Sequence, residues 1–145
     1  MPLEKKTEDY LRKNLLPIAA IKNPVDVIAA GGPDAYRAAM DAVLKDKNVD
    51  GVICIFVPPV VVDHRAVIKA IVETIEKNKN SKPVLGCFMS EAAEIAGSEQ
   101  MTKHKIPVYT FPESAVRAMW TMVRHRNWRD RPEGKIIEYE VDKKK

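Results

Sequence analysis

Three short apolar runs are spaced along the chain, at residues 53–57 (ICIFV), 82–89 (KPVLGCFM) and 106–111 (IPVYTF). Apolar runs of this length, bounded by Gly and Pro, are typical of strands buried on both faces. Residues 23–28 (NPVDVI) predict a further short strand or extended turn, because the residue before a proline is restricted to extended backbone. Near the C-terminus, the alternation at residues 135–141 predicts a short strand with one apolar face.

The segments between these runs carry apolar residues at helical spacing. Helices are expected from Thr7 to Leu16, from Pro33, from Asp63 to about Lys77, after Ser90, and from Pro112. Asp and Ser cap helix N-termini, and Pro suits the first helical turn. The expected inward-facing residues are Tyr36, Ala39, Met40, Val43 and Leu44, then Val67, Ala70, Ile71, Thr74 and Ile75, and finally Val116, Met119, Trp120 and Val123. Strands that alternate with such helices form a parallel sheet with right-handed crossovers. The predicted fold is therefore α/β, three-layered, mostly parallel and flavodoxin-like.

In a sheet of this kind, functional groups gather beyond the carboxyl ends of the strands. The loops at those ends are residues 29–34, 57–63 and 89–91. Pro58 and Pro59 stop the strand at residues 53–57, because neither can donate to a ladder. Two interpretations of this turn stay open. It aims the N-terminus of the next helix at an anionic group, or it only terminates the strand.

Composition limits the classes of protein to consider. The 145 residues are 46% hydrophobic and 30% charged, which is typical of one soluble globular domain. No apolar stretch is long enough to span a bilayer, and the first residues do not have the pattern of a signal peptide. Cys54 and Cys87 lie in apolar runs, which indicates reduced core thiols and a cytoplasmic protein.

The formal net charge is +4, and much of the excess lies in the lysine tail and in residues 122–132. Arginines beside Trp120 and Trp128 are compatible with nucleic-acid binding, but no nucleic-acid-binding motif accompanies them. We therefore interpret this stretch as a basic helix end or a protein interface. The three histidines are too scattered to predict a metal site, and no glycine-rich phosphate loop is present.

Four motifs follow one another in a fixed order: Asn23–Asp26, Tyr36 within a helix, an apolar strand from Asp50 to Pro58, and Ile106–Glu113. This ordered set resembles the flavodoxin-like ligase domain of the ADP-forming acyl-CoA synthetases, which belong to the superfamily of succinyl-CoA synthetase. The resemblance implies a CoA-ligase domain at residues 1–131. Residues 132–145 then form a C-terminal extension that contains the expected strand 135–141 and a solvated lysine tail.

The resemblance also implies a reaction, which interconverts acyl-CoA, ADP and phosphate with the free acid, CoA and ATP through a phosphohistidine. CoA, ATP or ADP, and Mg are cofactors of the complete enzyme, and this chain alone is expected to bind none of them and to be inactive. Its expected partners are CoA-binding, phosphohistidine and ATP-grasp domains or subunits, with a homodimer as a further option and no membrane or nucleic acid. The alternative is a non-catalytic regulatory module, like the synthetase-related region of some protein acetyltransferases.

Candidate site residues follow from the same resemblance. Residues 55–60, with Asp63, line up without a gap with a turn of succinyl-CoA synthetase that leads into a helix pointing at the phosphohistidine. The candidate phosphate or partner site is therefore Val57, Pro58, Pro59, Val60, Val61 and Asp63. Candidate loop residues are Asn23, Asp26, Gly31, Gly32 and Ser90. For Asn23 and Asp26 we favour a structural role as turn formers; no catalytic residue and no metal ligand is assigned.

One element of the family pattern is expected before Thr7 and is not present in this chain, namely the first strand and its helix. In the flavodoxin-like strand order, that strand lies between residues 23–28 and residues 53–57. The strand at 53–57 is then left with an open edge, which soluble proteins avoid. We expect the edge to be covered by residues 135–141 of the same or a second chain, or by a partner subunit.

Overall fold

The computed structural model describes residues 1–58, 62–78, 82–89 and 98–135. Its sheet contains β1 (Val52–Phe56), β2 (Val84–Phe88) and β3 (Val108–Tyr109), in that order and all parallel. Val52 is paired with Val84, and Gly86 with Val108. The three apolar runs therefore form the strands that the sequence predicts, and the α/β fold is confirmed. The strand expected at 135–141 extends beyond the described residues.

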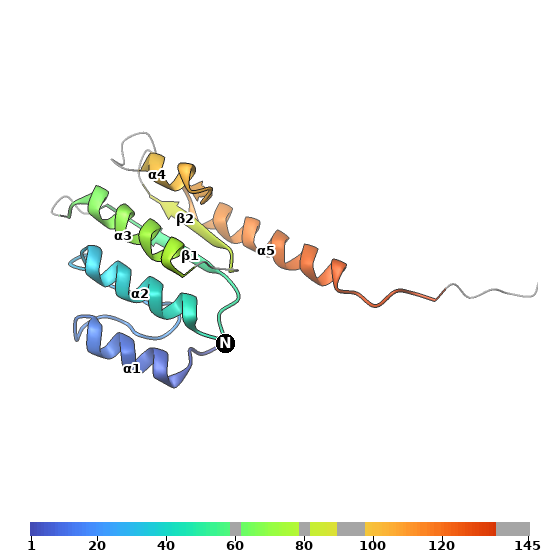
Figure 1. Ribbon diagram of the computed structural model, residues 1–145, viewed down its shortest axis with the longest axis horizontal. Helices are drawn as coiled ribbons and strands as arrows, with labels where there is room; N and C mark the ends of the chain where they lie inside the picture. The colour runs from blue at the N-terminus through green and yellow to red at the C-terminus, as the bar shows by residue number, and fades with distance from the viewer. Residues whose placement is uncertain (59–61, 79–81, 90–97, 136–145) are drawn as a thin grey trace, which may run out of the picture.

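Helices lie on both faces of this sheet (Figure 1). In chain order they are α1 (Lys5–Asn14), α2 (Pro33–Lys45), α3 (His64–Lys77), α4 (Ser98–Lys103) and α5 (Pro112–Arg129). The first three lie side by side, with α2 between α1 and α3. Because α5 covers the opposite face, the described part of the chain has the three layers of a doubly wound α/β domain.

Successive side chains of β1 point alternately to the two faces of the sheet. Cys54 and Phe56 are buried in the main core, with Met40 of α2 and Ile71 of α3. Ile53 faces the other way and packs in the cluster that contains Ala115 of α5. The inward stripe predicted for α3 is confirmed, since Val67, Ala70, Ile71 and Thr74 are all buried.

A buried carboxylate joins the N-terminus to the end of α2. Asp46 is fully buried, and its two oxygens accept the Glu4 N–H and the Asn48 N–H, each at 2.8 Å. The Lys82 ammonium donates to the Asp46 main-chain oxygen. Burial opposes ionisation of Asp46, but these hydrogen bonds and one from Thr7, together with the positive charge of Lys82, hold its pKa below the usual value.

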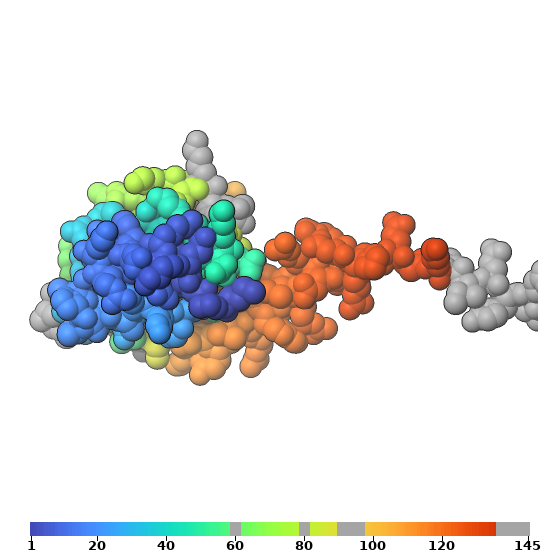
Figure 2. Space-filling model, turned by 90° about the horizontal axis from the view of Figure 1, so that it is seen from below, coloured from blue at the N-terminus to red at the C-terminus, as the bar shows by residue number. Residues whose placement is uncertain are grey.

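The inward face predicted for α5 is wrong at three positions. Ala115 is the buried residue, and Met119 packs with it, whereas Val116, Trp120 and Val123 are 54%, 55% and 47% exposed. Figure 2 shows the C-terminal half of α5 standing clear of the rest of the described chain. The apolar residues at these positions therefore have no covering element among the described residues, which is why periodicity alone misplaced them.

Residues 23–28 do not join the sheet. Their pairing consists of a single antiparallel bridge between Ala20 and Asp26, with hydrogen bonds of 3.0 and 2.9 Å in the two directions. Of the two sequence-based alternatives, the extended turn is therefore the one observed. This turn stands apart from β1, and a groove lies between them.

Candidate functional site

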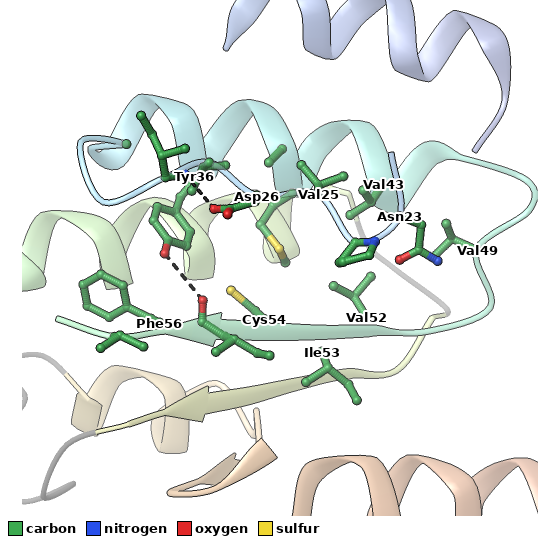
Figure 3. Close-up of a pocket in the computed structure, with 18 of the residues that line it drawn as sticks. Asn23, Val25, Asp26, Tyr36, Val43, Val49, Val52, Ile53, Cys54 and Phe56 are labelled. Carbon is green, nitrogen blue, oxygen red and sulfur yellow. Dashed lines mark hydrogen bonds between the residues drawn. The ribbon is translucent and has the colours of Figure 1, made fainter. Parts of the chain in front are cut away.

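A groove of about 700 Å³ runs along the outer edge of β1 (Figure 3). Strand β1 forms one wall, α2 contributes Tyr36, Met40 and Val43, and the turn at residues 23–29 forms the opposite wall. The lining is mainly apolar, because β1 and the stripe of α2 both direct core-type side chains into it. An elongated apolar groove beside a strand has the shape of a polypeptide site rather than that of a compact catalytic pocket.

The wall at residues 23–29 is held by local hydrogen bonds and by a glycine. The Asp26 carboxylate accepts the Ile28 N–H at 2.8 Å, and the Ile28 carbonyl accepts the Gly31 N–H at 3.0 Å. Ile28 has φ of 58°, which is rare for a β-branched residue. A Cβ on Gly31 would lie 2.5 Å from the Val27 oxygen, so only glycine fits there. The hydrogen bond between Asp26 and Ile28 supports the structural role predicted for Asp26.

The edge of β1 that faces the groove carries main-chain polar groups. Val52 donates to the Pro83 oxygen at 2.9 Å, and the Phe56 oxygen accepts the Met89 N–H at 3.1 Å. In a parallel ladder, alternate residues direct both main-chain groups to the same side. Val52, Cys54 and Phe56 therefore bond to β2, and the N–H and C=O groups of Ile53 and Ile55 point outward to the groove.

Tyr36 is the polar side chain that reaches this edge. Its hydroxyl points at the Ile55 carbonyl oxygen, 3.5 Å away (Figure 3). Its ring packs edge-on against Phe56, with the ring centroids 5.5 Å apart. Burial raises the pKa of Tyr36 well above its ordinary value, so the hydroxyl stays protonated and acts as a donor.

Cys54 also projects from β1 toward the groove (Figure 3). Burial raises the pKa of its thiol to about 12, so the group is neutral near pH 7. A neutral buried thiol is a poor nucleophile and a poor metal ligand. No group of three or more His, Cys, Asp or Glu side chains suited to a metal ion occurs among the described residues. The groove therefore offers apolar surface and main-chain hydrogen bonding rather than acid–base chemistry.

The structure brings two of the predicted loops to this groove. The predicted site residues that line it are Asn23, Asp26, Gly31, Val57 and Pro58. Gly32 lies at the N-cap of α2, and Asp63 caps α3, where its carboxylate accepts the Ala66 N–H at 3.2 Å. Pro59, Val60, Val61 and Ser90 lie outside the described residues. Tyr36 and Cys54 also line the groove, although their spacing in the sequence predicts only core positions for them.

No helix in the described parts of the chain has the length and apolar character needed to cross a membrane.

A family model described as "Ligase-CoA domain" matches residues 1–129. Subunit alpha of acetate–CoA ligase [ADP-forming] II from Pyrococcus furiosus is 40% identical over 125 residues, which are 84% of this chain and 27% of that subunit. The 4-hydroxybutyrate–CoA ligase [ADP-forming] of Nitrosopumilus maritimus is 29% identical over 129 residues, 89% of this chain and 18% of that protein.

Two solved structures have a similar fold. A Pyrococcus horikoshii protein matches with a TM-score of 0.72 and 37% identity, over 77% of this chain and 26% of its own. Dinucleotide-forming acetyl-coenzyme A synthetase 1 of Candidatus Korarchaeum cryptofilum, in complex with phosphate and ADP, matches with a TM-score of 0.75 and 28% identity, over 86% of this chain and 28% of its own. This chain thus spans about a quarter or less of the length of the curated relatives it matches.

Proposed function

The chain belongs to the Ligase-CoA domain family, and we propose that it works as a domain or subunit of an ADP-forming acyl-CoA synthetase in the cytoplasm. The observation that carries the proposal is the 40% identity, over 84% of this chain, to a subunit of an ADP-forming acetate–CoA ligase. The complete enzyme interconverts acyl-CoA, ADP and phosphate with the free acid, CoA and ATP.

The chain's part in this reaction is structural support and partner binding. It spans 27% of the length of the Pyrococcus furiosus subunit, so most of the chemistry belongs to other domains. In the groove, the Cys54 thiol is neutral because burial raises its pKa, and the Asp26 carboxylate is engaged by the Ile28 N–H. CoA, ATP or ADP, and Mg are therefore assigned to the complete enzyme, on domains that this chain joins.

A second contribution is the N-terminus of α3, directed at the phosphoryl group. The helix starts beyond the carboxyl end of β1, where ligands bind in α/β sheets. Its first turn contains no Asp or Glu and begins with His64 and Arg65, while the N-cap carboxylate of Asp63 lies at the same end and accepts the Ala66 N–H at 3.2 Å, which leaves the N–H groups of His64 and Arg65 for an anion. This assignment extends the candidate site at residues 57–63 to the start of α3.

Purification through a tag on this chain, from the source cells, tests the proposed function. The expected result is a complex that contains CoA-binding and ATP-grasp polypeptide and makes ATP from acyl-CoA, ADP and phosphate. The isolated chain is the control and is expected to make no ATP, so turnover by the chain alone would contradict the division of roles. Recovery of a protein acetyltransferase without synthetase polypeptide would instead identify the chain as a regulatory module.

A further inference from the structure

Arginine and tryptophan are concentrated in one stretch of the chain, on α5. Five of the eight arginines and both tryptophans lie between residues 117 and 131, and this stretch contains no lysine. Arginine differs from lysine because its planar guanidinium pairs with a carboxylate through two parallel hydrogen bonds and stacks on aromatic rings. The exclusive use of arginine here therefore indicates a surface for recognition, since lysine would serve equally well for solubility.

Four of these side chains share one side of α5, which we call the Arg–Trp face: Arg117, Trp120, Arg124 and Trp128. At about 100° per residue they lie within about 80° of one another, on the side opposite Ala115, which α5 buries against the sheet. The Arg124 guanidinium carbon lies 4.6 Å from the centroid of the Trp120 ring. The two tryptophans are 55% and 63% exposed, and the C-terminal half of α5 stands clear of the domain (Figure 2).

The two arginines of the Arg–Trp face differ from their neighbours on α5 in their charge partners. Arg126 and Arg129 contact the Asp130 carboxylate, at 3.4 and 3.1 Å. Arg117 and Arg124 have no carboxylate partner among the residues that the structure describes. Tryptophan and arginine are the residues that most often dominate the binding energy of protein interfaces. The face thus has the composition of an interface and lacks the carboxylates that its guanidinium groups would pair with.

We propose that the Arg–Trp face binds an acidic amphipathic helix of a partner polypeptide. Arg117 and Arg124 are seven residues apart, and a valine precedes each of them. Helices that share a seven-residue repeat pack side by side along their length. Carboxylates at that spacing on the partner helix pair with the two guanidinium groups, and apolar side chains beside them cover the tryptophan rings. This inference goes beyond the proposed function and does not depend on it, because no described residue of α5 lines the groove.

Acidic residues within this chain do not match the Arg–Trp face. Asp34 and Asp41 of α2 have the seven-residue spacing, but each is already paired with a cation of the same helix, Arg37 and Lys45 respectively. The acidic residues within 136–145 stand two positions apart, which is the period of a strand rather than that of a helix. The matching helix is therefore assigned to another polypeptide and not to a second copy of this chain.

A nucleic acid or an anionic membrane fits this face less well than an acidic helix does. Both bind mainly through the number of cations that contact them. The Arg–Trp face supplies two unpaired cations, and Asp130 brings a negative charge to the end of the same helix and pairs with Arg126 and Arg129. A helix with a few well-placed carboxylates matches two guanidinium groups, whereas a polyanion requires more.

Crosslinking in the source cells identifies the bound segment. The tagged full chain carries a photoreactive residue in place of Thr121, which is exposed one turn beyond Arg117. After illumination, one segment of a partner polypeptide should be recovered, with a helical pattern and with Asp or Glu seven residues apart. The same photoreactive residue in place of Lys69, which is exposed on α3, is the control and should not crosslink to that segment.

Two double variants of the full chain then separate the Arg–Trp face from charge alone. Arg117→Ala/Arg124→Ala changes the face, and Arg126→Ala/Arg129→Ala removes the same charge from other sides of the same helix. All four arginines are exposed and alanine favours helices, so both variants should melt within a few degrees of the unsubstituted chain. The yield of the crosslink from position 121 should fall about tenfold or more in the first variant and less than about twofold in the second.

An exchange of charges tests the pairing itself. Arg124→Glu should lower the crosslink yield about tenfold or more, because it places like charges opposite each other. Substitution of arginine for the facing carboxylate of the crosslinked segment should restore at least about half of the yield in the Arg124→Glu chain. If no carboxylate of that segment restores the yield when it is replaced by arginine, the proposed pairing is wrong.

Other outcomes overturn the inference in different ways. Crosslinks to nucleic acid or lipid, with equal losses in the two double variants, would identify a surface that binds through charge alone. Crosslinks between two copies of the chain would identify self-association. A yield from position 121 no higher than that from position 69 would show that the face is open to solvent. In each case the proposed function stands if synthetase polypeptide still co-purifies, whereas absence of that polypeptide alone refutes the proposed function and leaves this inference intact.

Discussion

The Tyr36 hydroxyl lies 3.5 Å from the Ile55 carbonyl oxygen and so stands where the N–H of a neighbouring strand would otherwise pair. The ring that carries this hydroxyl packs against Phe56. Tyr36 therefore has two separable roles, one in the core through its ring and one at the edge of β1 through its oxygen. The two roles can be tested independently.

Tyr36→Phe removes only the long hydrogen bond to the edge. We expect the free energy of unfolding of the isolated chain to change by less than about 1 kcal/mol. Tyr36→Ala also removes the ring from its contact with Phe56 and should cost about 3–5 kcal/mol. Urea unfolding followed by circular dichroism measures both. Equal losses for the two variants would show that the ring does not pack as described.

Ile71→Asp should unfold the chain. Ile71 is fully buried in the core between α3 and the sheet, and an unpaired carboxylate there has no compensating partner. The expected loss is about 4 kcal/mol or more, comparable with the stability of a domain of this size. Ile71→Leu, which keeps the volume, should cost less than about 1.5 kcal/mol. A melting temperature that Ile71→Asp leaves unchanged would contradict the observed orientation of α3.

Gly31 and Gly32 provide a matched pair in the turn that walls the groove. A Cβ at Gly31 meets the Val27 oxygen at 2.5 Å, whereas a Cβ at Gly32 meets no atom within 4 Å. Gly31→Ala should therefore lower the free energy of unfolding by about 1–3 kcal/mol. Gly32→Ala should cost less, about 0.5–1 kcal/mol, because Gly32 is the N-cap of α2, where Ala is less favourable than Gly. Thermal melts of the two variants measure this difference. A larger loss of stability in Gly32→Ala than in Gly31→Ala would contradict the described conformation of the turn.

Acid should destabilise the chain through Asp46. Its pKa in the folded state is lowered, so its contribution to stability is present above the unfolded value of about 3.9 and is lost as the pH falls through the folded value. The free energy of unfolding, measured from pH 7 down to pH 2, should fall across that window. In Asp46→Asn the overall stability should be lower by about 1–3 kcal/mol at pH 7 and the acid-dependent fall should be smaller. If the free energy of unfolding of Asp46→Asn fell with pH as steeply as that of the unsubstituted chain, Asp46 would not be the source of the acid sensitivity.

An anion should bind at the start of α3 if the proposed phosphoryl site is correct. Crystals grown with phosphate or sulfate should show the ion near the main chain that precedes His64, because the helix end favours negative charge. Asp63→Asn is the informative variant, since it removes the carboxylate that caps the helix and should strengthen anion binding. Weaker binding in this variant would argue against an anion at this end.

Much of this fold is predictable from local pattern. The strands β1 to β3 lie within the apolar runs, and the Asp63 cap and the buried stripe of α3 lie where helical spacing places them. Periodicity identifies which side of an element is apolar, but not which element covers it. Val116, Trp120 and Val123 were expected to face inward for that reason, and they border an uncovered space.

The groove could be predicted only in part. The strand order predicts that the edge of β1 lacks a neighbouring strand and is covered by residues 135–141 or by a partner, and that cover lies outside the described residues. The predicted loop residues Asn23, Asp26 and Gly31 do line the groove. The turn at residues 23–29 was harder, because its shape depends on the Ile28 backbone and on the space beside Gly31. Close main-chain contacts of this kind cannot be predicted from the spacing of hydrophobic residues. The contact between the Tyr36 hydroxyl and the edge of β1 is likewise visible only in the folded structure.

Under the proposed function, the open edge of β1 would make the cellular amount of this chain depend on the amount of its partner. Copies made in excess keep an apolar strand edge and the exposed tryptophan of α5 in contact with water, and such surfaces are recognised by chaperones and proteases. Copies bound in the proposed complex would cover such surfaces and escape degradation. Unassembled chains would therefore be removed, and the polypeptides of the complex would remain in matched amounts.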